Sequence, residues 1–462
     1  MNPQANTKIK TIVIAGASGY IGQNLIPLLL NAHPDAHIFA LSRAKQNSTN
    51  NRVTWLACDL FSFESLERNL NFDIDLAFYL VHSMGPTAQL DQGSFADYDL
   101  ILADNFARLI KLKNIRQLIY LGGLVPNEKT GLSLHLQSRV EVEDVFKYQK
   151  IPTTVLRAGL ILGDGGSSYQ ILIKLVRRLP VMLCPSWTQT LTTPIDLKST
   201  LSALLESSLN TDHINKTFDL SGCQPITYIE MMRNTASFYQ LKRLFVKVPF
   251  FTPTLSRLWV SLITNTSKDL VYPLIESLEH EMVARIDHLH PAANPNRSYN
   301  ELLSSVDKVK ITPFSFFHFR ARGNTVRSVQ RLPLPKGKSA DWIKKHYCIW
   351  LEKFLRPLIK VKFEQNKIKF CFLSARWVFL ELTDHPTQDA SEWQRLLITD
   401  GLLVGAKNQG RLEFRNVLEN RFVLAAIHDY KPALPWYIYV LTQANLHLWV
   451  MKSFRQHLLR KK

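Results

Sequence analysis

Cysteine is scarce in this sequence, and the few cysteines form no pattern. The five lie at positions 58, 184, 223, 348 and 371, with no Cys-x-x-Cys pair and no His/Cys cluster. An odd, unpatterned set of this kind fits a reducing compartment and cysteines that are buried as small hydrophobic residues. The polar start MNPQANTKIK also lacks the apolar core of a signal peptide. We therefore expect a cytoplasmic protein.

Acidic residues are scarce in the C-terminal third of the chain. Residues 320–462 hold 26 lysines and arginines against 11 aspartates and glutamates, a net charge of +15 within a total of +18. Such a region either makes a solubilising surface or meets an acidic partner, of which an anionic membrane surface is one alternative. Association at the inner face of the membrane is therefore an open alternative. We expect no nucleic acid, because no recognition motif accompanies the charge.

Apolar runs alternate with helix-length segments over the first part of the chain, which is long enough for two or three domains. Continuous apolar runs that are separated by helices indicate parallel strands covered on both faces, and hence a doubly wound α/β fold. Residues 165–305 are more mixed and predict a small substrate subdomain. The expected strands are residues 11–16, 37–43, 53–60, 76–84, 117–123 and 153–163.

A different pattern begins at Thr325, beyond a segment (307–324) that we interpret as a linker. Alternating stretches such as IKVKFEQNKIKFCF are typical of half-exposed antiparallel strands. We expect a strand at 325–332, a helix at 339–355, further strands to Tyr430 and a final helix at 434–459. The apolar side of that helix includes Trp436, Tyr439, Val440, Leu446 and Val450. The sequence thus predicts a basic α+β domain over residues 325–462.

Three glycines follow the first predicted strand and open the first helix, in the stretch GASGYIG (16–22). Glycines at this spacing allow a tight turn and let backbone N–H groups approach a pyrophosphate at the positive end of the helix. Strand, loop and helix all stand in the order that a dinucleotide-binding loop requires. The predicted cofactor contacts here are Gly16, Ser18, Gly19, Tyr20, Ile21 and Gly22.

The end of the second predicted strand indicates which dinucleotide is preferred. An aspartate there would accept a hydrogen bond from the ribose 2′-hydroxyl of NAD, but this chain has Ser42 and Arg43. A guanidinium favours a 2′-phosphate, so NADPH is preferred, with NAD as the alternative. Asp59, after the third strand, either contacts the adenine or caps a helix.

Taken together, GASGYIG, CDL (58–60), YLVHSMG (79–85) and LRAGLILG (156–163) resemble the atypical and extended short-chain dehydrogenase/reductases. The chain is most similar to bacterial NAD-dependent epimerase-like proteins with a C-terminal START-like (SRPBCC, DUF2867-type) domain. The resemblance implies a Rossmann domain over residues 1–306 and a helix-grip domain over residues 325–462. It also implies that a small apolar molecule or lipid binds in the C-terminal domain.

The same resemblance implies further cofactor contacts. Leu80, Val81 and His82 would line the ribose and nicotinamide, and Arg157 and Gly159 would lie beside the nicotinamide ring. Active members of the family use a Tyr-x-x-x-Lys pair on the helix after the fifth strand, with a serine or threonine near the end of that strand.

This chain lacks all three of those catalytic residues. His135 and Arg139 stand at the tyrosine and lysine spacing, and two glycines end the strand. His135 is a candidate proton donor because its ordinary pKa lies near neutrality, and Arg139 is a candidate ligand of ribose or phosphate. Both could equally be surface residues. No metal site is predicted, because His288-x-His290 has no third ligand at a recognisable spacing.

Two functions follow from these residues. The first is an NADPH-dependent oxidoreductase or epimerase that acts on an apolar carbonyl or a quinone-like substrate. The second is a catalytically inactive, NADPH-bound sensor or scaffold, associated in one version with a membrane surface. The missing tyrosine, lysine and serine favour the second, whereas the phosphate loop fits both.

Overall fold

A computed structural model describes residues 8–82, 90–126, 131–248, 260–261, 263–264, 268–306, 325–372, 377–387 and 389–461. The chain forms two compact units, which are described one at a time. The first contains residues 1–86 and 102–317, and the second contains residues 87–101 and 318–462. The predicted linker, 307–324, lies outside the described residues. The transfer of residues 87–101 to the C-terminal unit is a departure from the predicted domain boundaries.

The first unit is built on a parallel sheet of the Rossmann type, as predicted. Its seven strands run in the order β12-β7-β6-β4-β1-β2-β3, and every neighbouring pair is parallel. The chain moves outward from β1 in one direction and then returns to build from β4 in the other, so the sheet reverses its order between β1 and β4. The strands are β1 Thr11–Ala15, β2 His37–Ser42, β3 Val53–Ala57, β4 Leu76–Tyr79, β6 Gln117–Gly123, β7 Thr153–Ala158 and β12 Thr217–Asp219.

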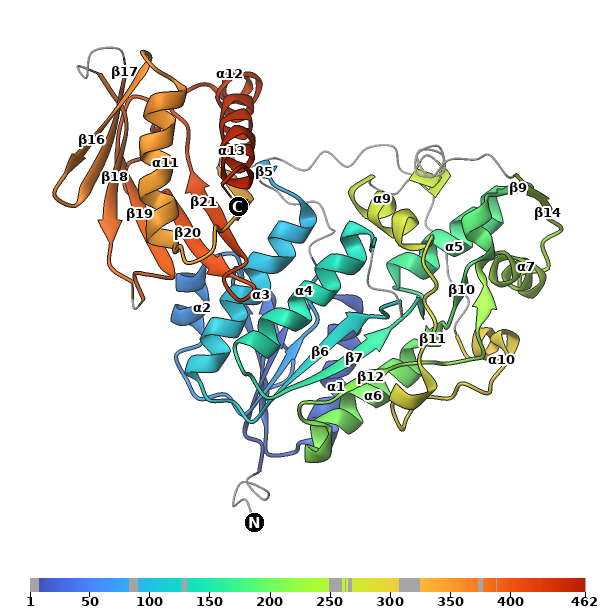
Figure 1. The fold of residues 1–462 in the computed structure, drawn as a ribbon. Helices are drawn as coiled ribbons and strands as arrows, with labels where there is room; N and C mark the ends of the chain where they lie inside the picture. The colour runs from blue at the N-terminus through green and yellow to red at the C-terminus, as the bar shows by residue number, and fades with distance from the viewer. Residues whose placement is uncertain are drawn as a thin grey trace. The chain divides into compact units, whose positions relative to one another are not determined.

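Helices cover both faces of this sheet (Figure 1). Successive side chains of β6 point to opposite faces of the sheet, and each face is covered by helices. Ile119 and Leu121 pack in the core with α1 and α6 on one face, and Tyr120 packs against Phe146 of α4 on the other. Tyr79 of β4 likewise contacts Phe106 of α3. The helices of this part are α1 Tyr20–Ala32, α2 Phe63–Asn69, α3 Phe95–Leu112 from residue 102 onward, α4 Leu134–Tyr148 and α6 Leu197–Leu209.

A smaller subdomain follows β7 and has a core of its own, to which α5, α7, α9 and α10 all contribute. Three two-stranded sheets connect these helices: β10 with β13, β11 with β8, and β14 with β9. The elements are β8 Ile161–Leu162, α5 Ser167–Arg178, β9 Val181–Cys184, η1 Ser186–Gln189, β10 Leu191–Thr192, β11 Ile195–Asp196, η2 Thr211–His213, β13 Ile226–Thr227, α7 Tyr228–Phe238, β14 Leu244–Lys247, α9 Lys268–Ser277, η3 Ile286–His288 and α10 Tyr299–Ser304.

The second unit is an eight-stranded sheet with helices packed on one face. The strand order is β16-β17-β18-β19-β20-β21-β15-β5, antiparallel throughout except where β5 joins β15 in parallel. The predicted antiparallel strands are therefore present. The elements are β5 Leu90–Gln92, β15 Val326–Pro333, α11 Ala340–Phe354, β16 Ile359–Glu364, β17 Lys367–Phe372, β18 Trp377–His385, β19 Trp393–Asp400, β20 Arg411–Val417, β21 Phe422–Tyr430, α12 Trp436–Leu441 and α13 Gln443–Leu459.

The final helix departs from the prediction in two respects. It is broken at Thr442, which has φ −116° and ψ −80°, so that α12 and α13 replace one continuous helix. Tyr439 and Val450 belong to the buried core as expected, but Leu446 is 53% exposed and faces outward. Among the described helices none is both long enough and apolar enough to cross a membrane. All five cysteines are free and buried.

Candidate functional site

The glycine loop connects β1 to α1 in a conformation that needs glycine. Gly16 has φ +86°, and a Cβ there would lie 2.9 Å from the backbone of Leu80. A Cβ on Gly22 would lie 2.6 Å from the carbonyl oxygen of Gly16. The N-cap residue Gly19 has no side chain to cap α1, and no acidic residue occupies the first turn. The positive end of α1 is therefore left to a ligand.

This loop forms one wall of a pocket with a cavity volume of about 560 Å³. The pocket lies at the carboxyl ends of β1, β4, β6 and β7, where the sheet order reverses and where parallel α/β sheets bind their ligands. All its lining residues belong to the first unit. Of the predicted residues it brings together Gly16, Gly19, Tyr20, Ile21, Gly22, Leu80, His82, His135, Arg139 and Gly159.

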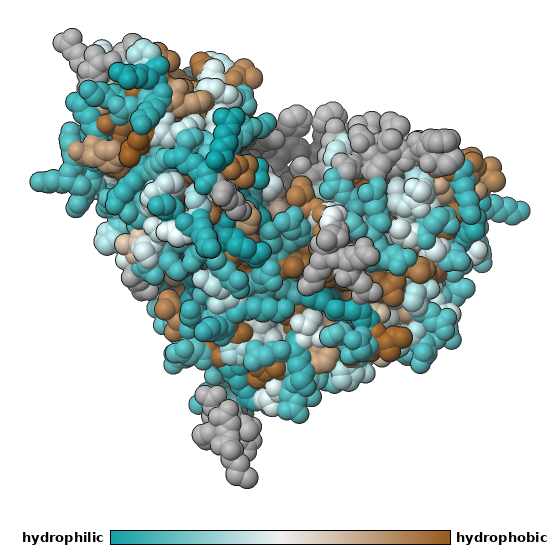
Figure 2. Space-filling view, in the orientation of Figure 1, coloured by the Kyte–Doolittle hydropathy of each residue, from teal (hydrophilic) through white to brown (hydrophobic). Residues whose placement is uncertain are grey.

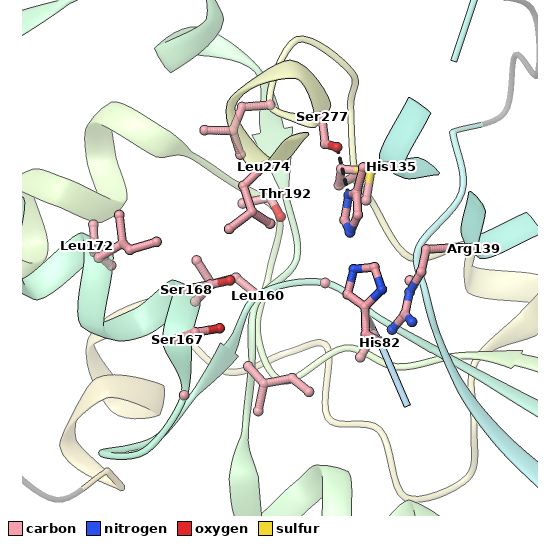
Figure 3. A pocket seen from close by; sticks show the side chains of 18 of the residues that line it. His82, His135, Arg139, Leu160, Ser167, Ser168, Leu172, Thr192, Leu274 and Ser277 are labelled. Atoms are coloured by element: carbon pink, nitrogen blue, oxygen red, sulfur yellow. Dashed lines mark hydrogen bonds between the residues drawn. The ribbon is translucent and has the colours of Figure 1, made fainter. Parts of the chain in front are cut away.

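His135 stands in the first turn of α4 and is held by a hydroxyl of α9. Its Nδ1 lies 2.8 Å from Ser277 Oγ (Figure 3), and Ser277 Oγ donates to the carbonyl oxygen of Pro273 at 2.9 Å. Because that hydroxyl has only one proton, it accepts from His135 Nδ1 and from the Ser133 hydroxyl, 3.0 Å away. An arrangement in which Ser277 donates to Pro273 favours the tautomer of His135 with its proton on Nδ1.

Arg139 follows His135 by one helical turn and lines the same pocket. It donates to the carbonyl oxygen of Leu121 at 3.3 Å, and its guanidinium lies 5.8 Å from the ring centre of Tyr120. Gly122 and Gly123, at the end of β6, also line the pocket. The positions at which the family resemblance implies a tyrosine, a lysine and a serine thus line the cavity as histidine, arginine and glycine.

Two further polar groups face the cavity from other elements. The His82 ring, beyond the end of β4, lies 5.1 Å from the His135 ring. The hydroxyl of Thr192, at the end of β10, is fully buried and points toward the pocket centre (Figure 3). His82, His135, Thr192 and Ser277 therefore join Arg139 among the polar groups that line the cavity, together with Ser167 and Ser168 at the start of α5.

The part of the cavity wall that comes from the small subdomain is mostly apolar. Leu172 and Leu175 of α5, Met231 and Met232 of α7, and Leu274 of α9 all line it. Among the described residues that line the pocket there is no aspartate, glutamate or lysine, and Arg139 is the one arginine. Such a wall suits an apolar ligand, because a charged group placed against it would lose hydration without gaining a partner.

Five predicted cofactor residues do not line the cavity itself: Ser18, Arg43, Asp59, Val81 and Arg157. Arg157 is buried on β7, and its guanidinium donates to both carboxylate oxygens of Glu143, at 2.9 and 2.7 Å. Its side chain is therefore occupied by an internal ion pair, although its neighbours Ala158 and Gly159 do reach the pocket.

Arg43 and Asp59, which were predicted to contact the adenosine part of the cofactor, lie outside the cavity. Arg43 is exposed just beyond β2, where the Ser42 hydroxyl accepts from the backbone of Ala44 at 3.3 Å. Asp59 is not the helix cap considered above, because Ser62 caps α2 by accepting from the N–H of Ser65. The Asp59 carboxylate instead accepts from the N–H of Phe61 at 3.1 Å, in the turn before that helix.

A second polar cluster lies apart from the pocket. Glu206, His213 and His290 have candidate metal-binding atoms within 4.8 Å of one another. His290 Nδ1 accepts from the N–H of Ala292, which places its proton on Nε2, and this nitrogen lies 3.1 Å from Ser207 Oγ. Burial lowers the pKa of His290 to about 4. These hydrogen bonds account for the two buried histidines as structural groups.

Sequence reasoning missed Thr192, Ser277 and the apolar wall. Thr192 lies within LTTPID (191–196), one more stretch on which the family resemblance rests beside the four motifs named above, so its motif offered a signal. No local pattern marks Ser277, since it meets His135 from 142 positions away. Most of the apolar stretch 248–266 lies outside the described residues, but Val260 lines the pocket.

Known families and proteins were compared with the chain. The model of the NAD dependent epimerase/dehydratase family matches residues 12–131, which hold β1, the glycine loop and the strands up to β6. Over these residues the chain is similar to that family. The match agrees with the motif-based resemblance within residues 12–131, and the remaining residues lie outside it.

The curated relative found is auxiliary protein GraX of Staphylococcus aureus, 32% identical over 161 residues. The match covers 31% of this chain and 51% of the relative, so the chain spans about half of that protein's length. Among solved structures, a nucleoside-diphosphate-sugar epimerase from Staphylococcus aureus is 12% identical, with a TM-score of 0.47, covering 65% of this chain and 98% of its own. UDP-glucuronic acid 4-epimerase from Bacillus cereus in complex with NAD is 14% identical, with a TM-score of 0.42, covering 59% and 97%.

Proposed function

We propose that the first unit binds NADPH and acts as an oxidoreductase or epimerase on an apolar carbonyl or quinone-like substrate. One observation carries this proposal: a single cavity is lined both by the glycine loop at the N-terminus of α1 and by the apolar side chains of α5, α7 and α9. A family that is described as NAD dependent supports a nicotinamide cofactor. The preference for NADPH rests on Arg43 at the end of β2, where the carboxylate that would favour NAD is absent.

The residues of the loop fit the proposed cofactor. At Gly16 and Gly22 a Cβ would collide with the backbone of Leu80 and of Gly16, so glycine is needed for the loop to pack this tightly. The first turn of α1 offers backbone N–H groups to a pyrophosphate without a competing carboxylate. Arg139 would hold a ribose hydroxyl or a phosphate oxygen. A bound reduced nicotinamide supplies a hydride to the carbonyl carbon of a substrate.

His135 is the proposed proton donor of this reaction. When protonated on both nitrogens, it gives its Nε2 proton to the carbonyl oxygen as that oxygen gains negative charge. It then returns to the tautomer with the proton on Nδ1, which Ser277 stabilises by accepting that hydrogen bond. Thr192 and His82 would position the substrate oxygen, and the leucines and methionines of α5, α7 and α9 would exclude water.

The apolar wall argues against a nucleotide sugar as substrate, because the lining residues that the structure describes include no acidic group and no lysine to bind hydroxyls or a diphosphate. The second unit supports a distinct proposal, a START-like domain that holds a small apolar molecule or lipid. Its sheet order and the placement of α11 after β15 and of α13 after β21 support that helix-grip arrangement.

The test begins with cofactor binding. Purified protein is titrated with NADPH and with NADH, with Arg43→Ala beside the wild type and Arg68→Ala, an exposed arginine of α2, as the matched control. We expect tighter binding of NADPH, a loss of about 10-fold or more in Arg43→Ala, and no change in the control. Absence of binding by either nucleotide would overturn the proposal.

Turnover is then measured with a set of apolar aldehydes, ketones and quinones. In His135→Ala we expect NADPH to bind normally and kcat to fall by about 100-fold or more. Gln137→Ala, an exposed change on the same helix, should keep full activity. Bound NADPH with no turnover of any acceptor in the wild type would instead favour the sensor or scaffold, a function that the missing tyrosine, lysine and serine already favour.

A further inference from the structure

Helices α11 and α13 of the second unit lie side by side and antiparallel (Figure 1). Three ring contacts define their seam: His346 with His457 at 5.2 Å, Trp350 with Phe454 at 5.0 Å, and Phe354 with Trp449 at 5.0 Å. The inner sides of both helices, including Leu351 and Phe454, are buried against the sheet. The outer sides of the two helices therefore make one continuous surface, joined across the seam.

This outer helical face consists of Ile349, Lys353, Phe354, Leu446, Trp449 and Lys452. Its four hydrophobic side chains are 37–53% exposed: Ile349 49%, Phe354 37%, Leu446 53% and Trp449 49%. In α12, at its edge, Tyr437 and Leu441 are 68% and 74% exposed. Single exposed hydrophobic residues are ordinary, but an apolar group that spans two packed helices marks an interaction surface. Figure 2 shows hydrophobic atoms interspersed with hydrophilic ones over these helices.

Positive charge accompanies these apolar groups. Lys353 and Lys452 are exposed, and Arg460 and Lys461 follow at the end of α13. After Asp429 the sequence contains six lysines and arginines and no aspartate or glutamate. The pKa of His346, in the seam, is lowered to about 4. Burial is the largest cause, followed by the charges of Lys461, His457 and Lys353. The outer helical face is thus apolar at its centre and positive around it.

We propose that the outer helical face docks the second unit on an anionic lipid bilayer. Aromatic and aliphatic side chains at half exposure can enter the headgroup region, while lysines beside them pair with lipid phosphates. A nucleic acid fits less well, since Ile349, Leu446 and Leu441 offer aliphatic surface where base stacking needs aromatic rings. Docking would bring the proposed apolar-ligand sites close to a bilayer, in whose interior apolar compounds dissolve. The docking proposal does not depend on the reaction proposed for the first unit.

The experiment uses the full chain and vesicle co-flotation. Vesicles contain phosphatidylcholine alone or phosphatidylcholine with phosphatidylglycerol, at about 50 mM and about 500 mM salt. We expect binding only to the anionic vesicles, at least about 10-fold weaker at high salt. The variant K353E/K452E should lose that binding by about 10-fold or more. The matched control K216E/K242E makes the same charge change at two exposed lysines of the first unit and should bind as the wild type does.

A second variant separates the apolar contribution from the charge. Trp449→Ser keeps every lysine and should weaken vesicle binding by about 10-fold while leaving the salt dependence in place. Circular dichroism and NADPH titration confirm that each variant is folded. Absence of wild-type binding to anionic vesicles at low salt would overturn the proposal, as would an equal loss in both charge variants. Tighter binding to single-stranded DNA than to vesicles, or a change of oligomeric state in Trp449→Ser without loss of vesicle binding, would assign the face to another partner.

Discussion

The pocket of the first unit and the core of the second unit differ in the charge that they hold. In the first, the pocket is lined by glycines, hydrophobic side chains and a few neutral polar groups, with one arginine. In the second, charge is abundant, both on the outer surface and inside: Glu413, Arg415 and His428 are each at most 1% exposed. The first unit keeps a cavity ready for a ligand, whereas the second satisfies its buried charges internally and presents the remainder outward.

The buried charge cluster of the second unit gives the largest expected effect. The carboxylate of Glu413 forms ion pairs with Arg411 Nε at 2.7 Å and with Arg415 Nη2 at 2.8 Å. Burial alone raises the pKa of Glu413, but the contact with His428 and the guanidinium groups of Arg415 and Arg411 hold it well below its usual range. Glu413→Gln leaves two arginines uncompensated, and we expect a loss of about 3–5 kcal/mol in the free energy of unfolding, measured in urea.

Glu364→Gln is the matched control for that change. Glu364 pairs with Lys369 at the surface, with its side chain 51% exposed, so its loss should cost less than about 1 kcal/mol. NADPH affinity should be unchanged in both variants, because the cavity belongs to the first unit. A similar destabilisation by the two substitutions would show that the second unit does not depend on its internal charge cluster.

Acid should destabilise the first unit through His290. Its pKa is about 4 in the folded state, lowered first by burial and then by His213, against an ordinary value of 6.5. The unfolded chain therefore binds the proton more readily, so stability is full above pH 6.5 and is lost as the pH falls toward 4. The expected loss from this group is about 3 kcal/mol. In His290→Gln this part of the pH dependence should disappear from urea unfolding curves, and an unchanged slope would contradict the assignment.

A substitution in the glycine loop should change the affinity for NADPH. Gly16→Ala places a Cβ 2.9 Å from the backbone of Leu80 at a φ of +86°, so the loop must shift. We expect NADPH binding to weaken by about 100-fold, or about 2.7 kcal/mol. Gly131→Ala is the control, because Gly131 also has a positive φ, +72°, but nothing lies within 4 Å of its Cβ position. Equal losses in both variants would mean that backbone strain alone is responsible.

The smallest expected effect concerns Tyr20, whose ring lies against Gly163 and Gly165. Its hydroxyl donates to Asp164 Oδ1 at 2.9 Å in an exposed position. Tyr20→Phe keeps the ring and removes this hydrogen bond, which we expect to cost about 0.5–1 kcal/mol of NADPH binding. Isothermal titration calorimetry would measure the change, and a loss as large as that of Gly16→Ala would mean that the hydroxyl itself contacts the ligand.

Much of the fold could be predicted because its signals are local. Apolar runs and glycines fixed the positions of the Rossmann strands and the loop, since each depends on neighbours within a few residues. The replacement of Tyr-x-x-x-Lys by His135 and Arg139 was equally readable, and both side chains line the cavity. The residues that surround His135 and Arg139 could not be predicted, because Ser277 and the wall formed by α5, α7 and α9 come from segments far along the chain.

The same distinction holds for the second unit. Alternation in the sequence predicted antiparallel strands and two long helices, but not that residues 90–92 would pair with β15, since strand pairing is a long-range choice. Helical periodicity placed Leu446 on the apolar side, whereas its side chain is 53% exposed. The sequence by itself determined the strands, the glycine loop, the spacing of His135 and Arg139 and the basic C-terminal third. Only tertiary packing decided the Ser277 partner of His135, the apolar part of the pocket wall and the outer helical face, because each needs residues that meet solely after the chain has folded.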